Sequence, residues 1–145
     1  MIHPKYININ RILGAMTFLI SFIVYFDTMA PSVSYWDCGE FIAVSYTLGV
    51  PHPPGSPLFL LLGRIASMLP ISEDIAFRVN LLSPLASAFS VLFLYFIIVQ
   101  LVNHWRGKIE TNTDALIAFG AGIVGSLTFA FTAVSYTHLT LPTMR

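Results

Sequence analysis

The sequence is poor in charge and in cysteine. Lys, Arg, Asp and Glu make up 10% of its 145 residues, seven basic residues balance seven acidic ones, and Cys38 is the only cysteine. The balance leaves no net field to attract nucleic acid, so no nucleic-acid partner is expected. A single cysteine excludes a disulfide within the chain and a cysteine-rich metal site. Signatures of phosphate-binding loops, serine-histidine-aspartate catalytic sites and zinc sites are also absent.

Apolar side chains dominate what remains. Hydrophobic residues make up 56% of the chain and its mean hydropathy is +0.77. Three runs, at about 11–28, 81–102 and 115–133, approach the roughly 20 helical residues that a bilayer core requires. We therefore predict an all-α integral membrane protein with three transmembrane helices.

Local signals refine the second and third of these runs. Asn80 stands where an N-cap is needed, and Pro84 falls in the first turn, where its missing N–H costs least. The third run contains Gly120, Gly122 and Gly125, small residues that let a neighbouring helix approach closely. Both runs are therefore expected to pack against other helices.

A fourth apolar run, at 57–69, is shorter than a comfortable crossing. It contains Arg64 and is closed by Pro70, so we predict an interfacial or re-entrant helix. Lysine and arginine are absent from 12–63, which places this segment outside by the positive-inside rule. If the short run does not cross the membrane, four basic residues lie on the inner side and two on the outer side. This distribution is preferred because the positive-inside rule favours an excess of Lys and Arg in the cytoplasm. Residues 29–80 then form one long extracytoplasmic loop with juxtamembrane helices.

The end of the sequence differs from the rest. Residues 1–133 are expected to form the N-terminal part of a multi-span membrane domain. Residues 134–145 resemble translated library-adaptor sequence found at the ends of unrelated gene fragments. We expect this tail to be non-native, so His138 and Arg145 receive no functional role.

The stretch from Trp36 to Phe41 concentrates acidic side chains in the outer loop. Asp37 as N-cap with Glu40 at N3 would form a capping box, and Trp36 with Phe41 would supply the hydrophobic staple beside it. The alternative is catalytic, since partial desolvation at a membrane surface raises the proton affinity of a carboxylate and suits it to act as a general base. A capped helix start would also fix the direction of the carboxylate, so the two interpretations are compatible.

His52 begins a stiff turn twelve residues after Glu40. The two prolines that follow it hold the chain extended, and Gly55 precedes the short apolar run. His52 is either a structural hydrogen-bonding residue or a substrate or metal contact beside Asp37 and Glu40. As histidine with carboxylates, these residues would suit a divalent cation, which is the candidate cofactor.

Arg64 and Arg78 are the cations expected on the outer side. Arg64 could simply extend to lipid headgroups, as arginines at a bilayer surface often do. Arg78 directly precedes the second span, where its guanidinium could bind a lipid phosphate through two hydrogen bonds. It is therefore the better candidate for an anion contact.

Two motifs together resemble one membrane-protein family. They are Pro31–Phe41, with the acidic pair, and Val50–Arg64, with the Pro-Pro turn leading into the short apolar run. Over Ile12–Phe131 the chain is similar to the protein O-mannosyltransferase-like family that includes transmembrane protein 260. Its wider class is the GT-C glycosyltransferases, membrane enzymes that take sugar from a polyprenyl-phosphate donor on the extracytoplasmic side.

The resemblance implies a function and a set of site residues. It implies transfer of a sugar, with mannose the candidate, to a hydroxyl of a protein or glycan acceptor on the extracytoplasmic side. We expect that side to be the periplasmic face of a bacterial inner membrane. The carried-over catalytic residues are Asp37 and Glu40, and the substrate contacts are Trp36, His52, Arg64 and Arg78. The acidic residues that the family carries after the third span are missing, so we expect this fragment alone to be inactive.

Two other functions fit the same residues. A transporter or lipid-handling protein would use the short apolar run as a re-entrant helix and the carboxylates to bind a cation or an amine. A non-enzymatic assembly subunit would use the glycine-bearing span as its interface. That reading predicts that Asp37 and Glu40 can be exchanged for other capping residues without loss of function.

Overall fold

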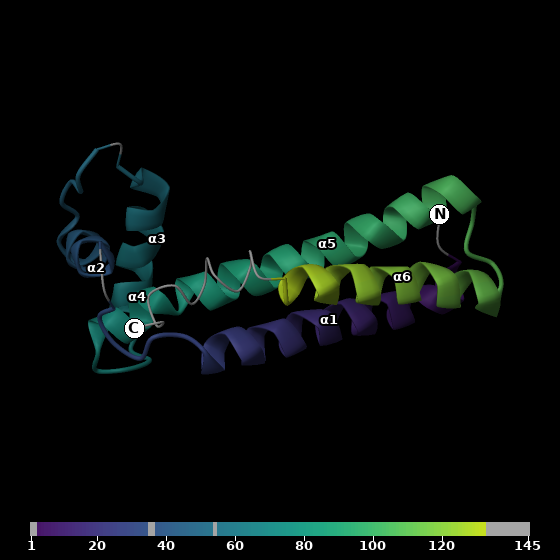
Figure 1. The fold of residues 1–145 in the computed structure, drawn as a ribbon, viewed down its shortest axis with the longest axis horizontal. Helices are drawn as coiled ribbons and strands as arrows, with labels where there is room; N and C mark the ends of the chain where they lie inside the picture. The colour runs from purple at the N-terminus through teal and green to yellow at the C-terminus, as the bar shows by residue number, and fades with distance from the viewer. Residues whose placement is uncertain (1–2, 35–36, 54, 133–145) are drawn as a thin grey trace. The chain divides into compact units, whose positions relative to one another are not determined.

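The structure is a computed structural model that describes residues 3–34, 37–53 and 55–132, and in these residues every regular element is a helix. Three helices are long and apolar enough to cross a membrane, which confirms the predicted all-α fold with three candidate spans. The six helices are α1 (Pro4–Asp27), α2 (Cys38–Thr47), α3 (Pro57–Met68), α4 (Ile75–Asn80), α5 (Leu82–Arg106) and α6 (Asn112–Ala130) (Figure 1). Residues 134–145, the expected non-native tail, lie outside the described residues, and that expectation stays a prediction.

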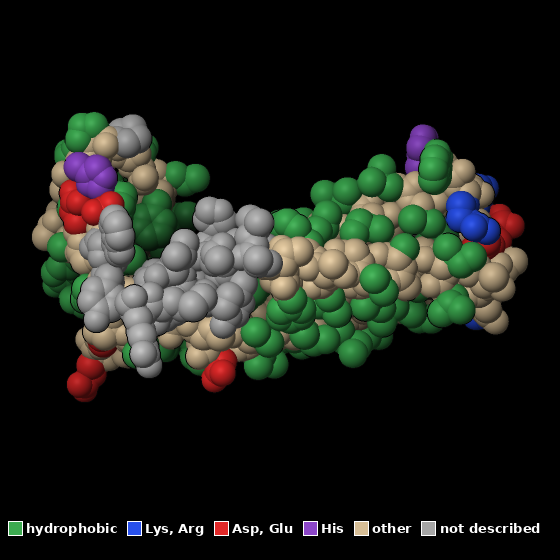
Figure 2. Space-filling view, viewed as in Figure 1, with side chains coloured by type: hydrophobic (Ala, Val, Ile, Leu, Met, Phe, Trp, Pro, Cys, Tyr) green, Lys and Arg blue, Asp and Glu red, His purple; other side chains and the backbone are tan. Residues whose placement is uncertain are grey.

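The chain forms two compact units, and the first combines the two ends of the described chain. It consists of residues 3–24 and 86–132, so it contains most of α1 and α5 and all of α6. Tyr95, Val99, Ala118 and Phe119 form the centre of its core. Figure 2 shows hydrophobic side chains along the visible face of these helices and charged side chains gathered at one end of them. This distribution is typical of helices surrounded by lipid.

Close helix contacts in this unit depend on small residues. A Cβ atom on Gly122 would lie 2.8 Å from ring carbon Cε2 of Tyr95 and 2.8 Å from Cγ2 of Val99. A Cβ atom on Gly125 would lie 2.7 Å from Cδ1 of Ile98, whereas one on Gly120 would meet nothing within 4 Å. Two of the three glycines predicted to permit close approach therefore do so.

Two tyrosine hydroxyls connect the long helices. The hydroxyl of Tyr95 on α5 donates to Oδ1 of Asn10 on α1 at 3.0 Å, and this bond is buried. The hydroxyl of Tyr6 on α1 donates to Oδ1 of Asn112 on α6 at 2.7 Å. A buried hydroxyl without a partner costs free energy, so these pairs favour one arrangement of the three helices.

The helices begin and end at other residues than predicted where polar side chains form hydrogen bonds with backbone groups at the helix ends. Helix α6 begins at Asn112, because Thr111 and Asp114 form a capping box: Thr111 Oγ1 accepts from the backbone N–H of Asp114, whose carboxylate accepts from the N–H of Thr111. Asn80 does not cap the second span as predicted. It is the last residue of α4, and its amide donates to the carbonyl oxygens of Ala30 and Ser32. Pro84 lies in the first turn of α5, as expected.

In the described residues the second unit is one stretch, 25–85, and it contains α2, α3 and α4. Ile42, Ala76 and Val79 form its buried core. Helices α2 and α3 come close at Gly63, because a Cβ atom there would lie 2.8 Å from Cβ of Ser45. The glycine therefore sets the spacing of the two helices that carry the candidate site and its surroundings.

Helix α3 is the short apolar run predicted from the sequence. Pro57 begins it, and Leu69, which directly precedes Pro70, is extended and ends it. Twelve residues span about 18 Å, less than the core of a bilayer. Leu58 and Ile65 expose 71% and 59% of their surface although they are apolar, so one face of α3 is available to lipid, as an interfacial helix requires.

The glycine contacts in the first unit predict opposite effects for two similar substitutions. Gly122→Ala should lower the free energy of unfolding by about 1–3 kcal/mol, because its methyl group would overlap the buried Tyr95 and Val99. Gly120→Ala is the matched control on the same helix, and it should be neutral or stabilising by up to about 1 kcal/mol. Denaturant unfolding in detergent micelles, followed by circular dichroism, measures both values. Equal effects of the two substitutions would contradict this packing.

Candidate functional site

Asp37 and Glu40 lie at the start of α2, but they do not form the predicted capping box. The N-cap residue Asp37 has φ −73° and ψ −1°, a helical conformation, and its side chain makes no capping hydrogen bond. An N-cap side chain normally reaches back from an extended backbone, so this conformation removes the capping geometry. The carboxylate of Glu40 binds His52 instead. Trp36, predicted as a staple and a substrate contact, lies outside the described residues.

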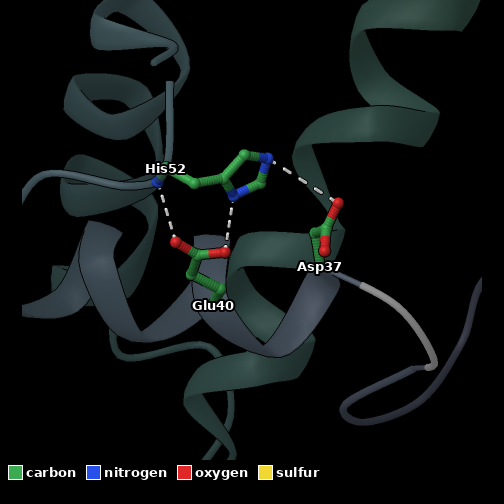
Figure 3. Close-up of polar contacts among 3 residues, drawn as sticks. All are labelled: Asp37, Glu40 and His52. Atoms are coloured by element: carbon green, nitrogen blue, oxygen red, sulfur yellow. Dashed lines mark hydrogen bonds and ion pairs between the residues drawn. The ribbon is translucent and has the colours of Figure 1, made fainter. Parts of the chain in front are cut away.

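His52 is held by both carboxylate oxygens of Glu40. Its backbone N–H donates to Oε1 at 2.9 Å, and its ring nitrogen Nδ1 lies 2.7 Å from Oε2 (Figure 3). The other ring nitrogen, Nε2, lies 3.9 Å from Oδ2 of Asp37. The side chains of Asp37, Glu40 and His52 expose 62%, 38% and 49% of their surface. The structure therefore brings together the three residues that one of the two interpretations of His52 placed side by side, at a site open to solvent.

Local structure explains why His52 reaches Glu40. Helix α2 ends at Leu48, whose left-handed φ of 55° turns the chain back after Thr47. Pro51 is then buried beside His52. The ring of Phe41 meets the imidazole of His52 edge-on, with centroids 5.9 Å apart. The return of the chain and the aromatic contact together fix the position of the imidazole.

The contact between Glu40 and His52 changes the pKa of both groups. Hydrogen bonds from the ring and the backbone N–H of His52 lower the pKa of the Glu40 carboxyl. The hydrogen bond to Glu40, followed by the charges of Glu40 and Asp37, raises the pKa of His52. Both shifts favour the charged pair, carboxylate with imidazolium.

The direction of each shift gives the pH range of this interaction. The raised pKa of His52 contributes stability that is present below its ordinary value and is lost as the pH rises through the raised value. The lowered pKa of Glu40 contributes stability that is present above its ordinary value and is lost as the pH falls through the lowered value. The ion pair is therefore complete between the ordinary pKa of glutamate and that of histidine.

A mostly apolar cavity of about 350 Å³ lies beside this cluster in the second unit. Its apolar walls include Phe41, Ile42, Phe59 and Val79, and its polar groups include Ser56 and Asn80. Cys38, next to Asp37 in sequence, also lines it. Burial, followed by the negative charge of Asp37, raises the pKa of the Cys38 thiol. Two lining residues connect the cavity to the cluster, since Cys38 follows Asp37 in sequence and the ring of Phe41 contacts His52.

From the sequence, Phe41 is expected only as part of a hydrophobic staple, and no pattern assigns a role to Phe59. Their rings meet at an interplanar angle of 89° with centroids 5.8 Å apart, and both line the cavity. Phe41 lies in the first turn of α2 and Phe59 in the first turn of α3. The sequence does not show that these two helices face each other. The signal that could have found them is the pair of aromatic residues flanking the acidic and Pro-Pro motifs.

The two arginines predicted as substrate contacts bind backbone carbonyl groups. Arg64 donates to the carbonyl oxygen of Tyr46 at 2.6 Å, and its guanidinium lies 5.3 Å from the centroid of the Tyr46 ring. Arg78 donates through Nη1 to the carbonyl oxygen of Ser67 at 2.8 Å and through Nε to that of Ser72. These contacts stabilise the ends of α2 and α3, and neither guanidinium joins the cluster of Asp37, Glu40 and His52.

The cluster also offers donor atoms of the kind that bind divalent cations. Asp37, Glu40 and His52 each have one such atom, and these atoms all lie within 4.8 Å of one another. However, Nδ1 of His52 is already hydrogen-bonded to Glu40, so a cation bound there would have to replace this bond. The observed arrangement is that of a carboxylate and imidazole pair rather than a preformed coordination shell.

Comparison with known proteins identifies the family. The domain described as "Protein O-mannosyl-transferase TMEM260 N-terminal domain" matches residues 37–139. The chain is 38% identical over 98 residues to "Protein O-mannosyl-transferase tmem260" of Dictyostelium discoideum, a match that covers 66% of this chain and 12% of that protein. It is 37% identical over 86 residues to "Protein O-mannosyl-transferase TMEM260" of Mus musculus, covering 59% of this chain and 12% of that protein. No solved structure matches the chain significantly.

The matched region has two consequences. Both relatives are eukaryotic, so they give no support to the bacterial inner membrane expected from the sequence. The region also begins at Asp37 and includes Glu40, His52, the cavity and the two later spans. Because this match covers well over half of the sequence, the chain belongs to the family of the protein O-mannosyl-transferase TMEM260 N-terminal domain.

Proposed function

We propose that this chain supplies the acidic part of the active site of a membrane glycosyltransferase of the GT-C class. The donor is a polyprenyl-phosphate-linked sugar, with mannose the candidate, and the acceptor is a hydroxyl group of a protein or glycan. The observation that carries this proposal is an exposed carboxylate, Asp37, in a loop between two candidate spans, next in sequence to Cys38, which lines a mostly apolar cavity. The names of the relatives support the reaction class.

In the proposed reaction Asp37 is the general base. Its carboxylate accepts the proton of the acceptor hydroxyl as the oxygen forms a bond to the anomeric carbon. The bond from that carbon to the phosphate oxygen breaks, and the lipid phosphate leaves with the electron pair. Since a phosphate is already a good leaving group, no general acid is required.

Arg78 is the proposed phosphate contact. Its Nε and Nη1 groups bind backbone carbonyl groups, which fixes the direction of the guanidinium. Arginine has five N–H donors, so it retains donors for an anion. Trp36, Arg64 and His52 are proposed to line the substrate region, as the family resemblance implies.

The matched segment covers 12% of the length of each relative, so the proposed transfer is an activity of a longer protein. We place the loop between α1 and α5 on the extracytoplasmic side. Four basic residues then lie on the inner side, at the N-terminal end of α1 and between α5 and α6, and this agrees with the positive-inside rule. They are Lys5, Arg11, Arg106 and Lys108.

The role of Asp37 predicts that Asp37→Asn lowers transfer by the full-length protein by at least about 100-fold. Folding should be unaffected, because Asp37 makes no capping bond and asparagine is an equally good N-cap residue. Sugar transfer from a radiolabelled lipid-phosphate donor measures the rate, and thermal unfolding measures stability. Asp27→Asn, at the exposed end of α1, is the matched control and should retain activity.

The outcome of this substitution separates the rival functions. Full activity of Asp37→Asn would remove Asp37 from the role of base. Transport or lipid flipping without formation of a glycosidic bond would favour a lipid-handling protein. Loss of activity together with a lower unfolding temperature would assign Asp37 a structural role.

The proposed topology predicts that Cys38 reacts with a membrane-impermeant maleimide from the extracytoplasmic side. The thiol is partly buried and its pKa is raised, so labelling should be slow at neutral pH and faster at higher pH. Asp37→Asn removes a negative charge next to the thiol and should speed the reaction. A detergent-denatured sample controls for a thiol that is merely buried. Labelling only from the cytoplasmic side would contradict the topology and the lipid-donor proposal.

A further inference from the structure

We propose that Glu40 and His52 act as a pair that resets Asp37 between reaction cycles. Glu40 is a positioning residue that holds the His52 imidazole in one orientation and one tautomer. His52 then takes over the proton that Asp37 removes from the acceptor. This inference rests on the proposed function, because it assigns roles to two neighbours of the proposed base.

The hydrogen bonds determine which ring nitrogen is free. A carboxylate only accepts hydrogen bonds, so His52 must donate from Nδ1 to Oε2 of Glu40 across 2.7 Å. In the neutral ring the proton therefore resides on Nδ1, and the lone pair is on Nε2. Nε2 is the nitrogen that faces Asp37, 3.9 Å from Oδ2 (Figure 3). Glu40 thus selects the tautomer that can accept a proton from Asp37.

Several contacts restrict the imidazole to this orientation. Glu40 binds the backbone N–H as well as ring atom Nδ1, so the carboxylate fixes the imidazole relative to the backbone of His52. The edge-on contact with Phe41 restricts rotation of the ring further. A carboxylate that fixes the orientation and tautomer of a catalytic histidine is a recurrent arrangement in enzymes.

The charged groups that face the His52 ring come from one element, the start of α2. They are Glu40 and Asp37, both of which raise the pKa of His52. On the helices packed against α2, Arg64 of α3 binds the carbonyl oxygen of Tyr46, and Arg78 of α4 binds that of Ser67. Neither arginine contributes to the shift in the pKa of His52, so among the described residues no cation opposes proton transfer from Asp37 to the ring.

The proton balance of a complete cycle is closed by water. The acceptor hydroxyl gives its proton to a carboxylate oxygen of Asp37 while the new glycosidic bond forms and the bond to phosphate breaks. Rotation of the exposed Asp37 side chain then shortens the 3.9 Å gap, and the acid gives its proton to Nε2. The resulting imidazolium is stabilised by Glu40 and releases its proton to solvent, to which His52 is half exposed. Asp37 is again a carboxylate.

The first test measures the pair without any reaction. The chain in lipid nanodiscs is labelled with ¹⁵N-histidine, and the His52 signals are assigned by their loss in His52→Gln. The neutral ring should be protonated at Nδ1, and Glu40→Gln should lower the pKa of His52. Glu73→Gln, which removes an exposed acid of the same unit, should leave the titration unchanged. An unchanged titration in Glu40→Gln, or a neutral ring protonated at Nε2, would overturn the proposal.

The second test measures kcat against pH in the full-length protein. The wild-type rate should rise with pH as His52 loses its proton. His52→Gln should remove this rise and lower the maximal rate at least tenfold, with little change in KM. Glu40→Gln should move the rise to lower pH, because it lowers the pKa of His52. His104→Gln, at the exposed end of α5, is the control and should keep the wild-type profile.

The outcomes distinguish this inference from the proposed function. If His52→Gln lowers kcat equally at every pH and keeps the wild-type rise, its role is structural and the inference fails. If chelators abolish transfer and a divalent cation restores it, the cluster binds a metal and the inference also fails. If the wild-type protein forms no glycosidic bond at any pH, the proposed function fails, and the tautomer measurement still decides whether the pair exists.

Discussion

The arrangement of the site depends on the carboxylate of Glu40, which accepts from the backbone and the ring of the same residue, His52. One side chain therefore closes the loop after α2 onto the first turn of that helix. The same contact holds the imidazole beside Asp37 and against Phe41. In the described part of the chain, the other polar contact between the Pro-Pro turn and the acidic motif is the 3.9 Å approach of His52 Nε2 to Oδ2 of Asp37. The contact between Glu40 and His52 thus determines both the path of the loop after α2 and the pKa shifts at the site.

Much of the fold could be predicted because it follows from hydrophobic length. The three long helices and the short α3 are visible as apolar runs, and a twelve-residue helix is too short to cross a bilayer. The ends of the helices were harder to predict. Thr111 and Asp114 form the capping box of α6, whereas the similar pattern at Asp37 and Glu40 does not form one. Capping patterns are local, and a stronger distant partner such as His52 can take the side chain away.

The site was predictable in its members but not in its contacts. The sequence left open whether His52 has a structural role or lies beside Asp37 and Glu40, and the structure shows the three side chains close together. The role of Gly63 could not be predicted, because the approach of Ser45 depends on how α2 and α3 cross. The contacts of Arg64 and Arg78 with backbone carbonyl groups also depend on where helices end in space. Sequence spacing does not contain that information.

The described part of the second unit is a single stretch of sequence, which has a consequence for the order of biosynthesis. Residues 25–85 are made as one uninterrupted stretch, after most of α1 and before most of α5, whereas the first unit needs both ends of the described chain. The bond between Glu40 and His52 closes a loop of only twelve residues, and closing so short a loop takes far less time than adding one residue during synthesis. The carboxylate and imidazole pair can therefore assemble on the nascent chain before α6 has been synthesised.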